Sequence, residues 1–396
     1  MKPVPRLLCI SLLLAHVHCS GAPSEDKNTR TVLIGFAGPL SWALTQSGQY
    51  AAQLAVNEAN RNNHVIDGKK VVFKLLAMDD KADPAVAGFV AKAMISAGVV
   101  GVIGHWTSAP TNAAAPLYSA AGMPHISPSA AAPEYTRQGY VTSFRAIGSS
   151  QDAVVGIADF VAQELKAKRI AVLDDASVFG SRLAELFAVQ VGSERQIVGR
   201  STVSNKTSDF NGALLQFAAS EADLIFFSGY LQRSEDLVRA RQRLRVPARL
   251  FLTGSVVNPI FLSMTQGASE GVFAAAPGKP YEDLAQFKAF EKNFATKFRA
   301  NISVYTLSTY DACNALIAAI RQANSLEHYK ITEELHKIRH KGLLGTVSFD
   351  GDGNLRNPLY TVYRVQDQRW VPVKTYEGRK KSCVADAGSG PACEGE

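Results

Sequence analysis

The stretch VIGHWTSAPTNAAAPLYSAAGMPHISPSA, residues 102–130, decides the fold. An apolar run ends at a glycine, small hydroxyl residues open a helix, and a similar arrangement follows at 123–130. Strand and helix alternating at this spacing are typical of a parallel sheet covered by helices. Small residues at helix starts let a bound group come close to the backbone, and we interpret that group as a ligand.

The same rhythm continues on both sides of this stretch. Strands are expected at 31–38, 71–80 and 99–104, with helices between them, and the pattern restarts at 169 and runs to 255. From about Gly271 it changes to long helices and an antiparallel hairpin pattern. We therefore predict an α/β fold of two doubly wound parallel-sheet lobes joined by a multi-strand hinge. The expected division is 31–146 plus 277–346 for lobe 1, 147–276 plus 347–375 for lobe 2, and a flexible tail at 376–396.

Length and charge are compatible with two lobes and exclude nucleic acid as the natural partner. The chain has 396 residues, of which 46% are hydrophobic, and a formal net charge of +7. That is enough apolar material for two cores. The basic excess is mild and spread out, and the densest run, RARQRLR at 239–245, distributes charge around a helix. This run is either a solvated helix surface or a contact for an acidic partner.

The first residues predict export to the periplasm. A basic start, the apolar run LLCISLLLAHV and a small-residue end near Ala22 make a secretory signal peptide over 1–22. Cys19 follows an apolar run and raises the alternative of a lipid anchor, although His16 and His18 stand where small residues would be needed.

The remaining cysteines fall into two environments. Cys313 lies in the apolar helical pattern YDACNALIAAI and is expected in the core. Cys383 and Cys393 stand in a tail rich in glycine, alanine and serine, where they form either a disulfide or two free thiols.

Motifs of several enzyme and metal classes are absent from the sequence. There is no GxxxxGK[ST], no HExxH and no strand-to-helix GxGxxG. The DGDGN segment at Asp350 is expected to be a hairpin turn, because Thr361 stands where a calcium loop needs glutamate. His105, His125 and His340 have no metal-ligand spacing and are expected to be structural. No cofactor is predicted.

Five short segments that each follow an expected strand make the candidate site. They contain Trp106, Thr107 and Ser108, then Ser129, Ala130 and Ala131, then Phe179, Tyr230 and Ser255. Free amides and a hydroxyl at a helix start favour an anionic group. Ser108 is the best single candidate, and it is either a plain N-cap of the helix beginning near Pro110 or a ligand contact.

Aromatic residues are expected to wall the cleft between the lobes. Trp42, Trp106, Phe179, Tyr230 and Tyr305 stand at or near element ends rather than in the middle of strands. Each alone could be ordinary packing. Together they favour a pocket at the strand ends, where open α/β sheets bind ligands.

Several of these segments resemble the leucine/isoleucine/valine-binding family of type I periplasmic binding proteins. The resemblance covers residues 31–373 and includes IGFAGPL, MDDKADP, VIGHWTSAPTNAAAPLY, MPHISPSAAAPEYT, VLDDASVFG and ADLIFFSGY. It implies an exported, non-enzymatic receptor that closes its lobes on a small molecule and delivers it to a membrane ABC permease. The site positions it implies are Ser108 for the ligand carboxylate, Ser129 to Ala131 for further contacts, Tyr230 closing from lobe 2, and Phe179 and Tyr305 as aromatic positions.

Two departures from the family pattern bear on the ligand. A family threonine aligns with Ala131, and the acidic residue that pairs with a ligand ammonium aligns with Ser255. An unpaired buried ammonium would cost several kcal/mol. Either Asp174 or Asp175 replaces the missing acid, or the ligand has no ammonium group.

We therefore predict a periplasmic ABC-type uptake receptor that binds an amino acid of the branched-chain type or a related small carboxylate or amide, as a monomer. The alternative is an extracytoplasmic sensor that presents its ligand to a membrane signalling receptor. An enzyme on this fold would need a nucleophile and base that the sequence does not show.

Overall fold

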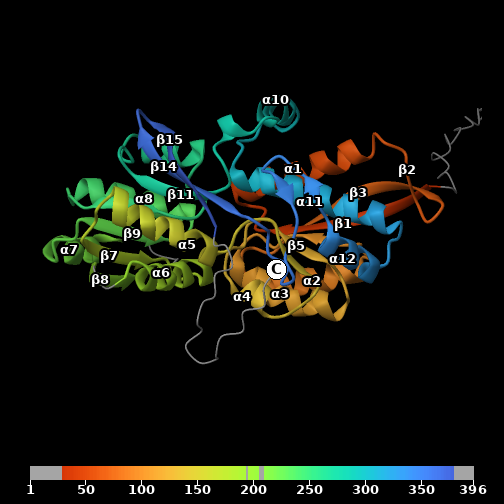
Figure 1. Ribbon diagram of the computed structural model, residues 1–396, viewed down its shortest axis with the longest axis horizontal. Helices are drawn as coiled ribbons and strands as arrows, with labels where there is room; N and C mark the ends of the chain where they lie inside the picture. Colours follow the sequence, from red (N-terminus) through yellow and green to blue (C-terminus); the bar gives the residue numbers. More distant parts are fainter. Residues whose placement is uncertain (1–28, 193–194, 205–208, 379–396) are drawn as a thin grey trace, which may run out of the picture.

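The computed structural model describes residues 29–192, 195–204 and 209–378, and it places their strands mainly in two large sheets that lie side by side (Figure 1). The first sheet has the order β2-β3-β1-β4-β5-β6. All its neighbours are parallel except the pair β2 and β3. Its strands are β1 (Thr29–Gly38), β2 (His64–Ile66), β3 (Lys69–Asp79), β4 (Val102–Ile103), β5 (His125–Ser127) and β6 (Ser143–Arg145).

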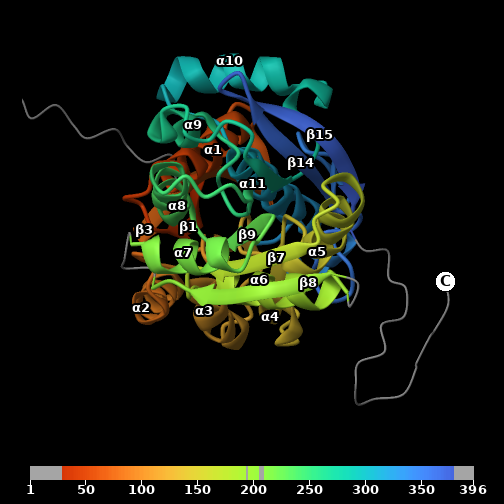
Figure 2. The ribbon, with the colours of Figure 1, turned by 90° about the vertical axis from the view of Figure 1, so that its left-hand side faces the viewer.

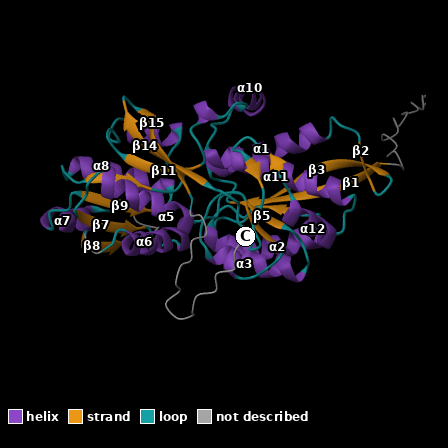
Figure 3. Ribbon diagram, in the orientation of Figure 1, coloured by secondary structure: helices purple, strands orange, loops and turns teal. Residues whose placement is uncertain are grey.

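Helices cover both faces of this first sheet (Figure 3). The chain order reverses between β1 and β4, so the connecting helices lie on opposite faces. On one side α1 packs on α11, which also packs on α12, and on the other α2 packs on α3. These helices are α1 (Ala43–Ala59), α2 (Pro84–Ser96), α3 (Ser108–Ala120), α11 (Val304–Ala323) and α12 (His328–Lys337). The short α4 (Glu134–Arg137) follows β5, and α10 (Phe287–Phe298) packs on α1.

The second sheet has the order β15-β14-β11-β10-β9-β7-β8 and faces the viewer in Figure 2. Its run from β8 to β11 is parallel, and β14 and β15 add an antiparallel hairpin at one edge. The strands are β7 (Arg169–Asp174), β8 (Gln196–Thr202), β9 (Leu224–Ser228), β10 (Arg249–Leu252), β11 (Phe273–Pro277), β14 (Leu359–Gln366) and β15 (Arg369–Glu377). The helices are α5 (Ser150–Asp159), continued by a π-helical turn at Phe160–Glu164, then α6 (Val178–Gln190), α7 (Asn211–Ala219), α8 (Leu231–Arg243) and α9 (Pro259–Thr265). The predicted fold class is confirmed.

Three segments cross between the sheets: one after β6, one after β11, and 348–358, which leads from the short pair β12 (His340–Lys341) and β13 (Thr346–Val347) to β14. Hydrogen bonds tie the first crossing to the third and to β14, because Arg145 N–H donates to Gly353 O at 2.9 Å and the Tyr360 hydroxyl to Gly148 O at 2.8 Å. Gly353 has φ +82°, and an added Cβ would clash with Ser143 O, so only glycine fits.

Several local predictions can be compared with the structure. Cys313 is fully buried, as predicted. The DGDGN segment forms the predicted turn, with Asp350 Oδ1 accepting N–H groups from Asp352 and Asn354. The 1–22 segment, Cys19, Cys383 and Cys393 lie outside the described residues. Within the described part of the chain, no helix is both long and apolar enough to span a membrane.

The basic run at 239–245 covers the end of α8 and the residues just after it, and three of its four arginines have side-chain partners within the chain. Arg239 pairs with Glu235, Arg241 donates to Ala248 O, and Arg243 donates to the Asn211 side chain. These contacts favour the reading of a surface helix over a contact for an acidic partner.

Candidate functional site

Two neighbouring cavities lie where loops of both lobes meet. The larger, which we call the outer cavity, has a volume of about 240 Å³, and the smaller, the inner cavity, about 30 Å³. Phe179, Gly254 and Tyr305 line both. The site position follows from topology: loops after β1 and β4 in one sheet, and after β7 and β9 in the other, flank the points where strand order reverses.

The outer cavity has an aromatic wall made by all five predicted aromatic residues. The Trp42 and Tyr230 ring centroids are 5.8 Å apart, Phe179 stacks on Tyr230 at 5.7 Å, and Trp106 lies 6.0 Å from Tyr305. Trp42, Trp106 and Tyr305 come from lobe 1, whereas Phe179 and Tyr230 come from lobe 2. Ser255 also lines this cavity. The residues of this cavity that sequence reasoning missed are Ser41, Ala43, Leu44, Leu231, Gln232, Ile260 and Met264.

The start of α3 differs from the predicted cap. Thr107, not Ser108, is the N-cap, and its side chain makes no capping hydrogen bond. The buried Thr107 hydroxyl has no partner among the described residues. Ser108 Oγ instead accepts the Ala132 N–H at 3.3 Å, so it ties α3 to the loop after β5. Both residues are buried and neither lines a cavity.

Tyr230 reaches from lobe 2 to this helix start. Burial raises the pKa of its hydroxyl, and a hydrogen bond from the Ser108 backbone opposes that rise. A second contact between the lobes is the Tyr305 hydroxyl, which donates to Gly254 O at 3.5 Å. At the surface, Arg182 Nε of α6 lies 2.5 Å from Glu134 Oε1 of α4. The structure therefore shows the lobes in contact around the cavities.

The 129–132 loop is held from several sides. Ser129 Oγ donates to Trp106 O at 2.6 Å, and the Ala130 N–H donates to Ser127 Oγ at 3.1 Å. Ala131 lines the inner cavity, whereas Ser129 and Ala130 line neither cavity. Behind the loop lies Arg145, a residue that the sequence analysis did not single out.

A buried histidine network supports the backbone before α3. His105 Nδ1 lies 2.7 Å from Asp80 Oδ2, and its Nε2 lies 3.2 Å from the Tyr118 hydroxyl. The His105 N–H donates to His125 Nε2 at 3.0 Å. Burial, and then the neighbouring His105, hold the pKa of His125 well below its ordinary value, so His125 is neutral. Both histidines have the structural role that was predicted for them.

Asp174 and Asp175 do not line either cavity. Asp175 accepts N–H groups from Ser177 and Tyr230 and the Ser177 hydroxyl, and burial raises its pKa. Asp174 accepts from Ala176, Ser181 and Thr202. The suggestion that one of them replaces the family acid is therefore not supported, because both carboxylates hold their own loops.

The described residues that line the two cavities carry no charge. Ser255 stands where the resemblance places an acidic residue, and its carbonyl accepts a hydrogen bond from the Asn258 side chain. The lining residues with polar side-chain groups are serines, a threonine, tyrosines, two tryptophans and Gln232. The site is thus neutral and largely aromatic.

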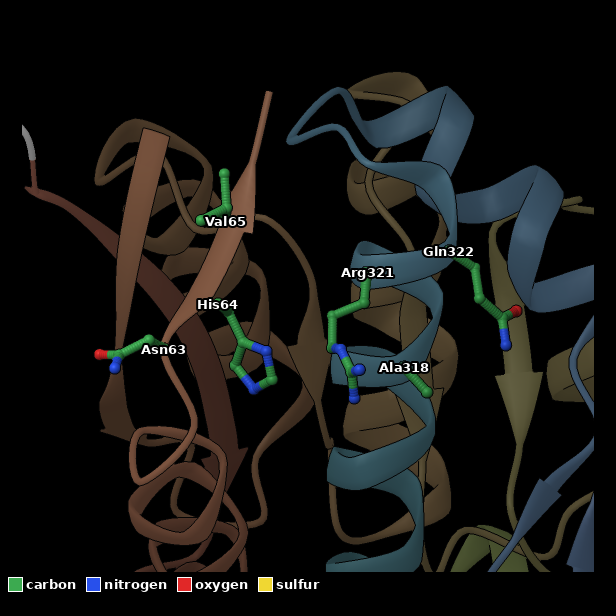
Figure 4. Close-up of a pocket in the computed structure, with 6 residues that line it drawn as sticks. All are labelled: Asn63, His64, Val65, Ala318, Arg321 and Gln322. Carbon is green, nitrogen blue, oxygen red and sulfur yellow. The ribbon is translucent and has the colours of Figure 1, made fainter. Parts of the chain in front are cut away.

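Another depression lies far from this cleft, between β2 and α11 (Figure 4). It is about 470 Å³ and is lined by Asn63, His64, Val65, Ala318, Arg321 and Gln322. Burial, and then Arg321, lower the pKa of His64. None of the predicted site residues lies there.

Comparisons with known proteins agree with this geometry. A family model described as periplasmic binding protein matches residues 31–369. The chain belongs to the periplasmic binding protein family. The leucine-, isoleucine-, valine-, threonine-, and alanine-binding protein of Pseudomonas aeruginosa is 29% identical over 360 residues, 89% of this chain and 95% of that protein. The Leu/Ile/Val-binding protein of Escherichia coli K12 is 24% identical over 361 residues, 90% of this chain and 94% of that protein.

Solved structures of the family share the fold. A branched-chain amino acid transporter substrate-binding protein of Streptococcus pneumoniae, in complex with isoleucine, has a TM-score of 0.80 at 24% identity, covering 88% of this chain and 100% of that one. A solute-binding protein of R. palustris in complex with benzoate has a TM-score of 0.78 at 16% identity, covering 90% and 98%. The family model confirms that the chain is a periplasmic binding protein, and the solved structures share its fold.

Proposed function

We propose that this periplasmic binding protein takes up a small carboxylate with an apolar, preferably aromatic, body and no ammonium group. The observation that carries the proposal is the neutral aromatic wall of the outer cavity, with Ser255 in place of an acid. The volume of about 240 Å³ suits a small molecule, since pockets for drug-sized ligands run from about 300 to 1,000 Å³.

The magnitudes argue against an α-amino acid. A buried ammonium without a carboxylate partner costs several kcal/mol. The faces of Trp42, Tyr230 or Phe179 could attract it through cation–π contacts, but such contacts contribute only about 0.5–2 kcal/mol. The desolvation cost is the larger of the two.

Recognition of a carboxylate needs no charged side chain at the cavity wall. The start of α3 provides helix-end N–H groups and the unpartnered Thr107 hydroxyl. Ser108 and the 129–132 loop lie next to it, and the Tyr230 hydroxyl meets the Ser108 backbone. A ligand carboxylate that displaced the Tyr230 hydroxyl would accept the same hydrogen bond from the Ser108 backbone.

The named ligands of relatives fall on both sides of this choice. The Pseudomonas relative is named for leucine, isoleucine, valine, threonine and alanine, and the R. palustris structure holds benzoate. We therefore keep a branched-chain amino acid as the second candidate.

The transport cycle that we propose uses the lobe division 31–146 plus 277–346 and 147–276 plus 347–375. The mature chain is exported by the 1–22 signal, acts as a monomer, and delivers the closed, loaded form to a membrane ABC permease. Closure then follows from the ligand's higher affinity for the closed state. The alternative is an extracytoplasmic sensor, whose ligand-bound form would bind a membrane signalling receptor. In that case the ligand-bound protein would not stimulate transport by a permease reconstituted in proteoliposomes.

The test uses ligand pairs that differ only in the ammonium group. The protein is unfolded and refolded to remove carried-over ligand, and thermal shifts are measured with 3-phenylpropanoate against phenylalanine, and 4-methylpentanoate against leucine. A ligand at a hundredfold excess over its Kd stabilises the fold by about 2.7 kcal/mol. Larger shifts with the two acids support the proposal. Larger shifts with the two amino acids refute it in favour of the second candidate.

A further inference from the structure

Arg145 is the largest fully buried side chain among the described residues. It ends β6 and lies directly behind the 129–132 loop. Its Nη1 donates to Ala130 O at 2.7 Å and to Ala132 O at 3.0 Å, and its Nη2 donates to the Thr136 hydroxyl at 3.2 Å. Its Nε donates to Asn354 Oδ1 at 3.3 Å. All four acceptors are uncharged.

This guanidinium has no counter-ion in contact with it. No ion pair between described residues includes Arg145, and the Tyr135 ring centroid lies 5.6 Å from its guanidinium carbon. Asp152 and Glu134 act on it only through their fields, since Asp152 caps α5 and Glu134 pairs with Arg182. Burial lowers the pKa of Arg145, but an arginine keeps its charge in proteins. A buried cation without a partner is costly, so it calls for an explanation.

The loop in front of Arg145 explains where this charge acts. The carbonyl of Ala130 and the N–H of Ala131 belong to the same peptide group. Arg145 holds that carbonyl, whereas none of the described residues accepts the N–H of Ala131, the loop residue that lines the inner cavity. A cation donating to a carbonyl polarises the peptide and strengthens its N–H as a donor.

We propose that Arg145 is a positioning residue that gives the site its preference for an anion, by polarising the peptide between Ala130 and Ala131 and by supplying a positive charge behind it. The cation already sits in its buried place before the ligand arrives. An anionic ligand therefore gains the attraction without desolvating a cavity-wall cation. This inference rests on the proposed function only in requiring a ligand carboxylate.

The cleanest test changes the charge of the partner and not the arginine. Asn354→Asp is nearly isosteric, and its carboxylate oxygen would lie where Asn354 Oδ1 already accepts from Arg145 and Thr136. The new carboxylate forms an ion pair with the guanidinium, and the cavity wall stays intact. Asn357→Asp is the matched control for an added negative charge, because Asn357 is exposed on the same crossing segment.

The readout is the ratio of affinities for an acid and its amide, measured by calorimetry with 3-phenylpropanoate and 3-phenylpropanamide. Asn354→Asp should lower the ratio about tenfold, mainly by weakening the acid, and Asn357→Asp should leave it unchanged. Arg145→Met should lower the ratio similarly, and Arg145→Lys should restore most of it. A purely structural role would weaken acid and amide equally, and an unchanged ratio in Asn354→Asp would overturn the proposal.

The same experiment separates this inference from the proposed function. If the wild-type protein binds leucine and neither phenylpropanoid, the proposed ligand class is wrong. The Arg145 proposal is then read from leucine and leucinamide, which also differ in the carboxylate, with the same expected tenfold change and the same refuting result.

Discussion

Replacing Ser255 with glutamate is expected to convert the site to one that accepts ammonium ligands. Ser255 lines the outer cavity, where the described lining residues carry no charge. Ser255→Glu places a carboxylate at the position where the family has an acid. Ser255→Gln is the matched control, because it has nearly the same size and hydrogen-bonding reach without the charge.

The expected gain can be bounded from the geometry of the site. Two unit charges about 4 Å apart attract by about 4 kcal/mol at an effective dielectric constant of 20. Desolvation of both charges offsets part of this, and a hydrogen bond to a charged group contributes a net of about 1.5–3 kcal/mol. Phenylalanine should therefore bind Ser255→Glu about tenfold to a hundredfold more tightly than Ser255→Gln.

Isothermal titration calorimetry of phenylalanine and 3-phenylpropanoate on both variants gives the required comparison. The acid should gain nothing from the glutamate, because two carboxylates would then share a buried site. Circular dichroism and thermal unfolding check that both variants fold. Equal affinities of the two folded variants for phenylalanine would refute the reasoning that Ser255 determines the ligand class.

Three further outcomes are expected. Ser108→Ala should weaken carboxylate binding by about 1.5–3 kcal/mol in calorimetry with the fold intact, and unchanged affinity would remove Ser108 from the site. Burial raises the pKa of Asp311 from 3.8 to about 7, in spite of the N–H groups that Leu343 and Leu344 donate to it. The protonated carboxyl therefore stabilises the folded state fully below about pH 4, and this contribution is lost as the pH rises through 7. The unfolding free energy of the wild type should fall by up to about 4 kcal/mol relative to Asp311→Asn over this range, and parallel pH profiles would contradict it. Glu134→Gln should weaken ligand binding by at most about 1 kcal/mol, because the ion pair with Arg182 is partly exposed. The loss should vanish in 1 M salt, which screens this pair, and a loss that persists there would contradict the prediction.

Most of the aromatic wall could be predicted from the sequence, because four of its five residues follow strands and only Tyr305 lies in a helix. Residues that follow parallel strands meet at one edge of a sheet, so Trp42 and Trp106 approach each other in lobe 1 once β1 and β4 are neighbours. Phe179 and Tyr230 do the same in lobe 2 after β7 and β9. No side-chain detail is needed for that inference.

Local hydrogen bonds were harder to predict. Thr107 and Ser108 are consecutive hydroxyl residues before Pro110, and either could cap the helix. The choice depends on Ala132, which lies across the loop and uses the Ser108 oxygen. Similarly, Asp175 has the composition of a free site acid, but it is used by the Tyr230 N–H, a contact 55 residues away in sequence.

Arg145 could not be found from the sequence because an arginine at a strand end is usually exposed. Its burial depends on Asn354, 209 residues further along the chain, which reaches it through the crossing segment. The consequence is a separation of tasks within the site. Uncharged aromatic groups from both lobes can close on the ligand body, while the charge that selects the carboxylate stays fixed inside lobe 1 behind Ala130. Because that charge is already buried in this structure, ligand binding need not desolvate a charged protein side chain at the cavity wall, and contact with the aromatic wall contributes to the free energy of closing.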